Sequence, residues 1–276
     1  MQFMLLVKSD ASAEAGAMPD KKTLAAMGTF NDEMVKAGVM LAGEGLKPSS
    51  KGARVRCTKA TGKITVTDGP FAEAKELVAG YWLIQTKSKA EAVEWAKRVP
   101  FESGEVEIRP LFELEDFPQD PTQDKPAEWR EKERAMRDAL SAQTKRGSKK
   151  MRFVGFVMGG KDSESGVLPE SDAMEKMGAF VEEGMKAGVF LGGDGLKPTV
   201  DGVRVHYDGT KRTVVDGPFT EAKEIVAGYS ILAVDSKEEA IAWTKRFVAV
   251  DAEIRSIPEV TCEIRELFEV EDFPAA

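Results

Sequence analysis

The segment Asp68-Gly69-Pro70-Phe71 is followed within five residues by three charged side chains, Glu73, Lys75 and Glu76. Carboxylates and an ammonium group this close together can bind a small polar ligand, and a buried carboxylate can also transfer protons. Asp, Gly and Pro set the geometry of a tight turn, and Phe can anchor such a turn to the core. A turn does not need the three charges that follow it. Two interpretations therefore stay open, a structural turn and a ligand-binding segment.

The whole segment occurs a second time, as Asp216-Gly217-Pro218-Phe219 with Glu221, Lys223 and Glu224 after it. The charges are retained while many other polar positions differ, which favours a functional use. We therefore expect a polar cleft beside each turn, at the mouth of a sheet, because ligand sites are common at domain interfaces. The candidate ligand-binding residues are Glu44, Arg54, Asp68, Lys75 and Glu76 around the first turn, and Asp194, Arg204, Asp216, Lys223 and Glu224 around the second.

Two functions of different class are compatible with these residues. The first is a non-catalytic module that binds a small ligand or has a regulatory role. The alternative is an enzyme that uses Asp68 or Asp216 as a carboxylate acid or base on a small metabolite. A carboxylate buried against Phe71 or Phe219 would favour the enzyme, whereas a solvated or arginine-paired one would favour binding or a structural role.

Cofactor and metal chemistry has little sequence support. Gly43-Glu44-Gly45 lacks the third glycine, the Lys-Ser or Lys-Thr pair and the following helix of a phosphate-binding loop. His206 is the one histidine, and the two cysteines, Cys57 and Cys262, form no C-x-x-C pair. A zinc site is not expected, the thiols should be reduced and structural, and we expect no cofactor. An all-carboxylate magnesium or calcium site stays open.

Three further positions have a structural and a functional interpretation. His206 is predicted to be a partly exposed strand residue, with a general base in one copy as the alternative. The acidic pairs Glu115-Asp116 and Glu271-Asp272, each followed by Phe-Pro, are predicted to solvate a chain end, with weak metal binding as the alternative.

An internal repeat explains why the motif occurs twice. Residues 19–48 align with residues 169–198, and the match continues to the end of the chain, where the second copy gains eight residues around Asp251 to Val260. Each copy is as long as a typical domain, so one copy should form one domain rather than a short unit of a solenoid. The sequence therefore predicts a first domain at residues 1–118, a linker at residues 119–150 and a second domain at residues 151–276.

Hydrophobic periodicity predicts the elements of one copy. The expected strands are Gln2–Lys8, Val39–Ala42, Ala53–Thr58, Lys63–Thr67, Tyr81–Thr86 and Glu105–Leu114. Val39–Ala42 leads into a turn at Gly43–Gly45, and Ala53–Thr58 forms a hairpin with Lys63–Thr67. The expected helices run from Pro19 to Gly38 and from the capping residue Ser88. This order is that of an elaborated ferredoxin-like α+β domain, whose sheet has helices on one face. The other face needs a cover, and we expect the second copy to provide it about a pseudo-twofold axis.

The linker contains Trp129, Met136 and Leu140 among charged residues, a pattern that predicts a connector helix. A partner-binding helix or a basic patch for a polyanion stays open.

Composition narrows the class of protein. The chain has 276 residues, 42% of them hydrophobic, and a net charge of −8. The net charges of the first copy, the linker and the second copy are −1, +3 and −10. No part is basic enough to follow a phosphate backbone, so a nucleic-acid partner is not expected. The longest apolar runs are far too short for a membrane span, and no leader sequence is apparent. We expect a cytoplasmic protein with no membrane partner. Its two copies should form a pseudo-dimer within the chain, and whether the chain also forms a homodimer stays open.

The motif, with Gly80-Tyr81 after it and Gly43–Leu46 before it, resembles the DGPF-domain proteins of the YCII-related family. The resemblance covers both copies and implies two tandem ferredoxin-like domains packed as a dimeric α/β barrel. It implies less about function, because most such proteins have no assigned activity. One branch is similar to an enzyme built on a His/Asp dyad. Here the first helices contain no histidine, and the second helices are expected to end at Pro100 and Val248 without an aspartate.

Overall fold

The computed structural model describes residues 1–72, 77–116, 150–166, 171–219, 225–255 and 257–272. The first copy contains β1 (Gln2–Lys8), α1 (Ala11–Glu14), α2 (Lys21–Lys36), β2 (Met40–Gly45), η1 (Ser49–Lys51), β3 (Ala53–Thr58), β4 (Lys63–Asp68), β5 (Val78–Gln85), α3 (Lys89–Lys97), β6 (Ser103–Pro110) and η3 (Leu114–Asp116). The second contains β7 (Met151–Met158), α5 (Lys161–Glu164), α6 (Ser171–Lys186), β8 (Phe190–Gly195), η4 (Thr199–Asp201), β9 (Val203–Asp208), β10 (Lys211–Asp216), β11 (Val226–Val234), α7 (Lys237–Ile254), β12 (Glu259–Glu266) and η6 (Val270–Asp272).

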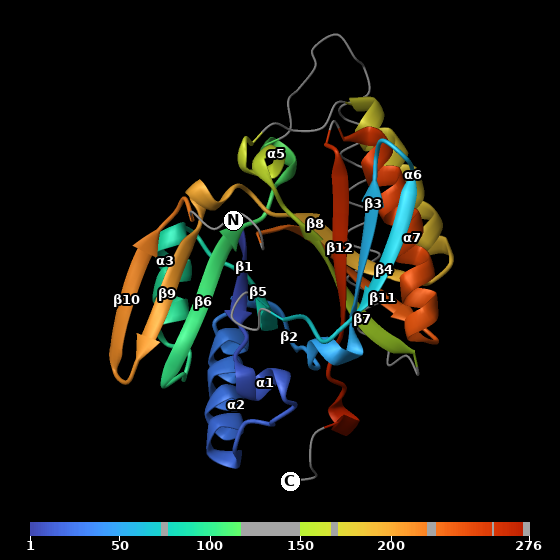
Figure 1. Cartoon of the computed structure of the whole chain (residues 1–276). Coiled ribbons are helices and arrows are strands. Elements are labelled where there is room, and N and C mark those ends of the chain that lie inside the picture. Colours follow the sequence, from blue (N-terminus) through green and yellow to red (C-terminus); the bar gives the residue numbers. More distant parts are fainter. Residues whose placement is uncertain (73–76, 117–149, 167–170, 220–224, 256, 273–276) are drawn as a thin grey trace.

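The strands form two six-stranded antiparallel sheets, and each sheet contains strands from both copies. The first sheet has the order β10-β9-β6-β1-β5-β2, and the second has the order β4-β3-β12-β7-β11-β8. In Figure 1 the orange hairpin β9-β10 lies beside the green strand β6, and the cyan hairpin β3-β4 lies beside the red strand β12. The copies have therefore exchanged their hairpins.

The two exchanges use equivalent registers. Arg54 of β3 lies opposite Glu263 of β12, and Arg204 of β9 lies opposite Glu107 of β6. The predicted hairpin is confirmed, but the expectation that each copy completes its own sheet is wrong. A hairpin paired within its own copy and a hairpin paired with the other copy show the same alternation of buried and exposed side chains. The local sequence therefore does not distinguish the two arrangements.

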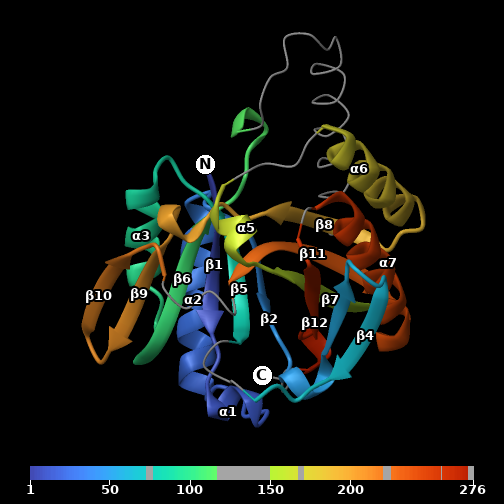
Figure 2. The same ribbon diagram turned by 45° about the horizontal axis from the view of Figure 1, so that its top comes forward.

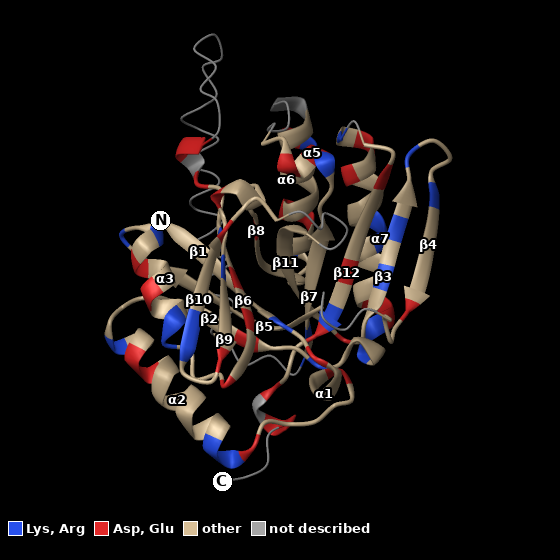
Figure 3. Cartoon of the chain, turned by 60° about the vertical axis from the view of Figure 1, so that its left-hand side comes forward, with Lys and Arg blue, Asp and Glu red and all other residues tan. Residues whose placement is uncertain are grey.

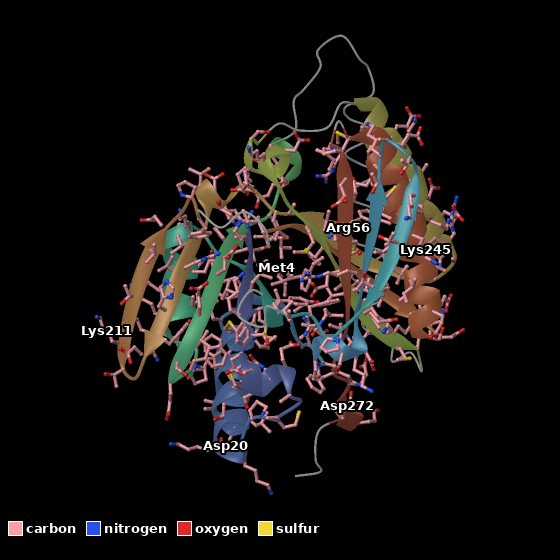
Figure 4. The ribbon with its side chains drawn as sticks, viewed as in Figure 1. Met4, Asp20, Arg56, Lys211, Lys245 and Asp272 are labelled. Atoms are coloured by element: carbon pink, nitrogen blue, oxygen red, sulfur yellow. The ribbon has the colours of Figure 1, made fainter. Side chains whose placement is uncertain are left out.

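Three apolar layers hold the sheets and helices together. Helices α2 and α3 cover the outer face of the first sheet, and α6 and α7 cover that of the second (Figures 1 and 2). In β1, Phe3 and Leu5 point to the helices, whereas Met4 and Leu6 join a cluster that includes Val154 of the other sheet. Figure 4 places Met4 in this middle layer. The inner faces of the two sheets thus share one apolar core.

Most helix ends follow the sequence signals. The Asp20 side chain accepts a hydrogen bond from the Thr23 amide (2.7 Å), and Ser88 caps α3. Gly38, with φ of +68°, follows the end of α2 in the left-handed conformation that glycine favours.

Some predicted boundaries are wrong, and the last strand of the first copy ends at Pro110 rather than at Leu114. The Gly43-Glu44-Gly45 segment is not a turn, because β2 continues through it and pairs with β5. The second helix of the second copy does not end at Val248. The inserted residues extend α7 to Ile254 and bury Asp251 within it.

The exchange also brings the two cysteines to one sheet. Cys57 lies opposite Val260, and Cys262 lies opposite Val55, so both thiols face the apolar cluster under α7. Both are free and buried, as predicted. Burial raises the pKa of the Cys262 thiol.

The predicted linker helix around Trp129, Met136 and Leu140 lies outside the described residues. Among those that are described, none of the helices combines the length and apolar character needed to cross a bilayer.

Candidate functional site

The Asp-Gly-Pro-Phe segment forms a turn pressed against η1. A Cβ atom added to Gly69 would lie 1.9 Å from the carbonyl oxygen of Ser49, a distance at which atoms overlap, so the position requires glycine. The Gly69–Pro70 peptide bond is cis. The Phe71 amide donates to Oγ of Ser49 (3.1 Å), whose own amide donates to Glu14 (2.9 Å). The turn is thus tied to the end of α1.

The same turn is also tied to the other copy. The guanidinium carbon of Arg54 lies 4.3 Å from the centre of the Phe71 ring, and its Nε donates to Oε2 of Glu263 at 2.7 Å. Arg265 donates from one nitrogen to Glu263 (3.2 Å) and from another to Glu14 (3.0 Å). These contacts close a ring that starts and ends at Phe71 and crosses between the copies.

The second turn builds an equivalent ring. Its members are Phe219, Thr199, Glu164, Arg109, Glu107 and Arg204. Arg204 lies 4.0 Å from the Phe219 ring and donates to Glu107 at 2.9 Å. A Cβ atom at Gly217 would lie 1.8 Å from the Thr199 carbonyl oxygen, as at the first turn.

Among the described residues, the second ring carries one more cation than the first. Lys8 Nζ lies 3.2 Å from Glu107, whereas the corresponding residue of the second copy is Met158. Burial alone would raise the pKa of Glu107, but Lys8, Arg109 and Arg204 outweigh it and lower that pKa to about 2. Glu107 is therefore a buried, permanently charged carboxylate at physiological pH.

The two motif aspartates lie outside the rings. The side chains of Asp68 and Asp216 are 71% and 79% exposed, respectively. Lys237 of the other copy's α7 donates to Asp68 (2.7 Å), and Lys89 of α3 lies 3.7 Å from Asp216. Both carboxylates are thus solvated and lysine-paired rather than buried against the motif phenylalanines.

The remaining candidate residues are grouped across the copies. Glu44 and Arg204 belong to one row of residues across the first sheet, which runs through Tyr81, Leu6 and Glu107. The equivalent row of the second sheet is Asp194, Tyr229, Phe156, Glu263 and Arg54. The structure therefore brings Glu44 into line with Arg204, and Asp194 into line with Arg54, because the hairpins are exchanged. Figure 3 shows the charged positions within β3, β6 and β12.

Glu44 has a strong partner within the chain. Arg152 of β7 donates to both of its carboxylate oxygens (2.6 and 3.2 Å) and also to Glu269 (2.9 Å). In the second row the Tyr229 hydroxyl donates to Asp194 (3.2 Å), and the Tyr81 and Tyr229 ring centres are 6.2 Å apart. Burial, and then the charge of Glu44, raise the pKa of Tyr81.

Four candidate residues, Lys75, Glu76, Lys223 and Glu224, lie outside the described residues.

Sequence reasoning missed most of the ring residues. Glu14 with Glu164, Ser49 with Thr199, and the Glu-Ile-Arg segments at residues 107–109 and 263–265 all recur between the copies. The recurrence of these residues is thus visible in the sequence. It points to a site only once the strands that carry them are known to be neighbours.

The other predicted positions have charged partners in the structure. The His206 side chain is 45% exposed, as predicted for a strand histidine, and contacts Glu105 at 2.9 Å. The acidic pairs do more than solvate chain ends, because Asp116 and Asp272 contact Lys197 and Lys47. No group of three or more metal-ligating side chains occurs within the residues that the structure describes.

The fold and the two rings define an α+β protein made of two repeated units that share their sheets. The family model of the YCII-related domain matches residues 1–115 and again residues 122–262. The chain therefore belongs to the YCII-related family. It is 32% identical, over 116 residues, to the "Uncharacterized protein R00369" of Rhizobium meliloti (strain 1021). The match covers 40% of this chain and 92% of that protein, which thus corresponds to one of the two copies.

Proposed function

We propose that this protein is a non-catalytic module that binds a small polar ligand beside its two Asp-Gly-Pro-Phe turns and has a regulatory role. The observation that carries the proposal is the ring at each turn. The phenylalanine of the turn stacks on an arginine that also donates to a buried glutamate of the opposite copy. A ligand that contacts such a turn would therefore act on the junction between the copies.

The repeated charges are the proposed ligand contacts. Lys75 follows Phe71 by four residues, so chain length alone keeps its Cα atom within about 15 Å of the Cα atom of Phe71, the residue on which Arg54 stacks. Among the described residues, Arg54 pairs with Glu263 and Arg204 pairs with Glu107, and the proposal assigns the charges that follow each turn to the ligand.

The enzyme alternative has less support. It requires Asp68 or Asp216 to be buried against a motif phenylalanine, and both are exposed and paired with lysines. Asp251 is a buried aspartate on the second helix of the second copy, but the first helices, α2 and α6, contain no histidine to complete a dyad.

We also propose that the two units form a dimeric α/β barrel within one chain. Support comes from the equivalent hairpin registers, from the shared inner core and from a relative that contains a single copy.

A thermal-shift screen against small polar metabolites tests the ligand proposal. Compounds that raise the melting temperature of the full chain should lose this effect in the variant Lys75→Ala/Glu76→Gln/Lys223→Ala/Glu224→Gln. The control, Lys22→Ala/Asp32→Asn on the exposed side of α2, should keep it. An unchanged shift in the fourfold variant would refute the proposed site, and consumption of the compound would support the enzyme instead.

A further inference from the structure

Strand β10 presents apolar side chains at an open edge of the first sheet. Val214 and Val215 are 39% and 43% exposed, and β10 has a hydrogen-bonded neighbour on one side, β9. The corresponding residues of β4 are Val66, which is partly buried, and Thr67. The exposed apolar edge is therefore a feature of one copy and not of the repeat.

Unequal helices explain this difference. Helix α7 has 18 residues and packs over β3 and β4, where Ile64 and Val66 join the apolar cluster of the second sheet. Helix α3 has 9 residues, and the cluster beneath it, as far as the structure describes the chain, includes no side chain of β10. Figure 1 shows β10 at the outer edge of its sheet, and Figure 4 shows Lys211 there. Val214 lies opposite the buried Val205, so it faces the helix side of the sheet, at a point that no helix among the described residues covers.

The hairpin geometry fixes which backbone groups of β10 face outward. Asp208 and Lys211 flank a two-residue loop and lie opposite each other, so they form a hydrogen-bonded pair. Hydrogen-bonded and non-hydrogen-bonded pairs alternate along an antiparallel ladder. The N–H and C=O groups of Arg212, Val214 and Asp216 consequently point away from β9.

We propose that β10 pairs antiparallel with β10 of a second copy of this chain, about a twofold axis at Val214. A symmetric antiparallel pair places one residue opposite itself, and outward-facing groups must meet outward-facing groups. Val214 on the axis satisfies both conditions. This register places Arg212 of each chain opposite Asp216 of the other.

The charges of the edge favour this partner. Arg212 donates to the carbonyl oxygens of Lys97, Gly209, Lys211 and Phe101 and lies over the Tyr207 ring, and within the described part of the chain no carboxylate contacts it. Asp216 is 79% exposed and its lysine contact is long, at 3.7 Å. Charged residues usually protect an edge strand from pairing. In this register they attract each other instead.

Strand β4 is less suited to the same pairing. Its Asp68 already accepts from Lys237 at 2.7 Å, and its apolar side chains are packed beneath α7. The matching positions of β4 therefore supply controls for every variant of β10.

Sedimentation equilibrium of the full chain, between roughly 10 µM and 1 mM, tests the proposal, because an edge of this size gives a weak dimer. We expect a monomer–dimer equilibrium that Val214→Pro abolishes, since proline at an outward-facing edge position removes no bond to β9. Val66→Pro should leave the dimer intact. Asp216→Lys should weaken the dimer roughly tenfold, and Asp68→Lys should not.

Amide hydrogen exchange provides a second test that does not depend on variants. Protection of the Arg212, Val214 and Asp216 amides should rise with protein concentration, while that of Thr213 and Val215 should not. A monomer at all these concentrations, or a dimer that Val214→Pro leaves unchanged, would overturn the proposal.

Discussion

Arg54 of the first copy donates from Nε to Oε2 of Glu263 in the second copy, at 2.7 Å. The two residues are 209 positions apart, and they are opposite each other because the hairpin β3-β4 has joined the sheet of the other copy. Glu263 is 2% exposed and Arg54 stacks on Phe71, so this pair connects a repeated turn to a buried carboxylate within β12. The same connection recurs through Arg204 and Glu107.

Glu107→Gln should strongly destabilise the fold. The substitution leaves Lys8, Arg109 and Arg204 around a neutral side chain, and breaking a buried ion pair in this way costs about 3–5 kcal/mol. Urea denaturation at neutral pH measures the loss. Glu94→Gln on the surface of α3 is the control, since Glu94 is 68% exposed, and it should change stability by less than about 0.5 kcal/mol.

The same carboxylate should make the protein sensitive to acid. Its pKa falls from 4.5 to about 2 on folding, so its contribution is complete above pH 4.5 and is lost as the pH falls towards 2. At about 1.4 kcal/mol per pKa unit this contribution is about 3 kcal/mol. Wild-type stability should therefore decline over this window more steeply than that of Glu107→Gln, and parallel pH profiles would contradict the assignment.

Asp251 should have the opposite pH dependence. Burial raises its pKa, and the nearby Arg255 only partly offsets this. The folded state therefore favours the protonated form, and Asp251 reduces stability as the pH rises above the ordinary value of 3.8. Asp251→Asn should remove that decline and leave the protein at least as stable as the wild type at pH 7. A large destabilisation at pH 7, measured by urea denaturation, would show that the Arg255 pair dominates.

Much of the fold can be predicted from the sequence, but the way the copies combine cannot. The repeat, the strand and helix order and the hairpin are all visible, because side-chain period and capping residues are local signals. The hairpin exchange is not visible, because Arg54 could equally face Glu107 of its own copy or Glu263 of the other. The extension of α7 was missed because it depends on tertiary packing over β3.

Gly69→Ala should destabilise the protein more than an ordinary loop substitution. The new Cβ would meet the Ser49 carbonyl oxygen at 1.9 Å, so the turn or η1 must move, at a cost we expect to exceed about 2 kcal/mol. Gly28→Ala is the matched control, because nothing lies within 4 Å of the position its Cβ would take in α2. It should stabilise the helix by up to about 1 kcal/mol. Equal effects of the two substitutions on the melting temperature would argue against a tightly held turn.

Residues 1–118 alone should form a homodimer. This half contains both Arg54 and Glu107, and the two registers in the full chain are equivalent, so two halves can exchange hairpins with each other. Sedimentation velocity should show the dimer, and aggregation would still fit the exposed apolar face. A soluble monomer with a native-like melting transition would contradict the intrachain pseudo-dimer.

A double-mutant cycle tests the exchange of hairpins most directly. Arg54→Met and Glu263→Gln should be coupled by about 1–3 kcal/mol in the free energy of unfolding, because the two residues are in contact. Arg54→Met and Glu107→Gln should be additive within about 0.5 kcal/mol, because they belong to different sheets. Strong coupling of Arg54 to Glu107, with none to Glu263, would show that each copy keeps its own hairpin and would contradict the junction on which the proposed function rests.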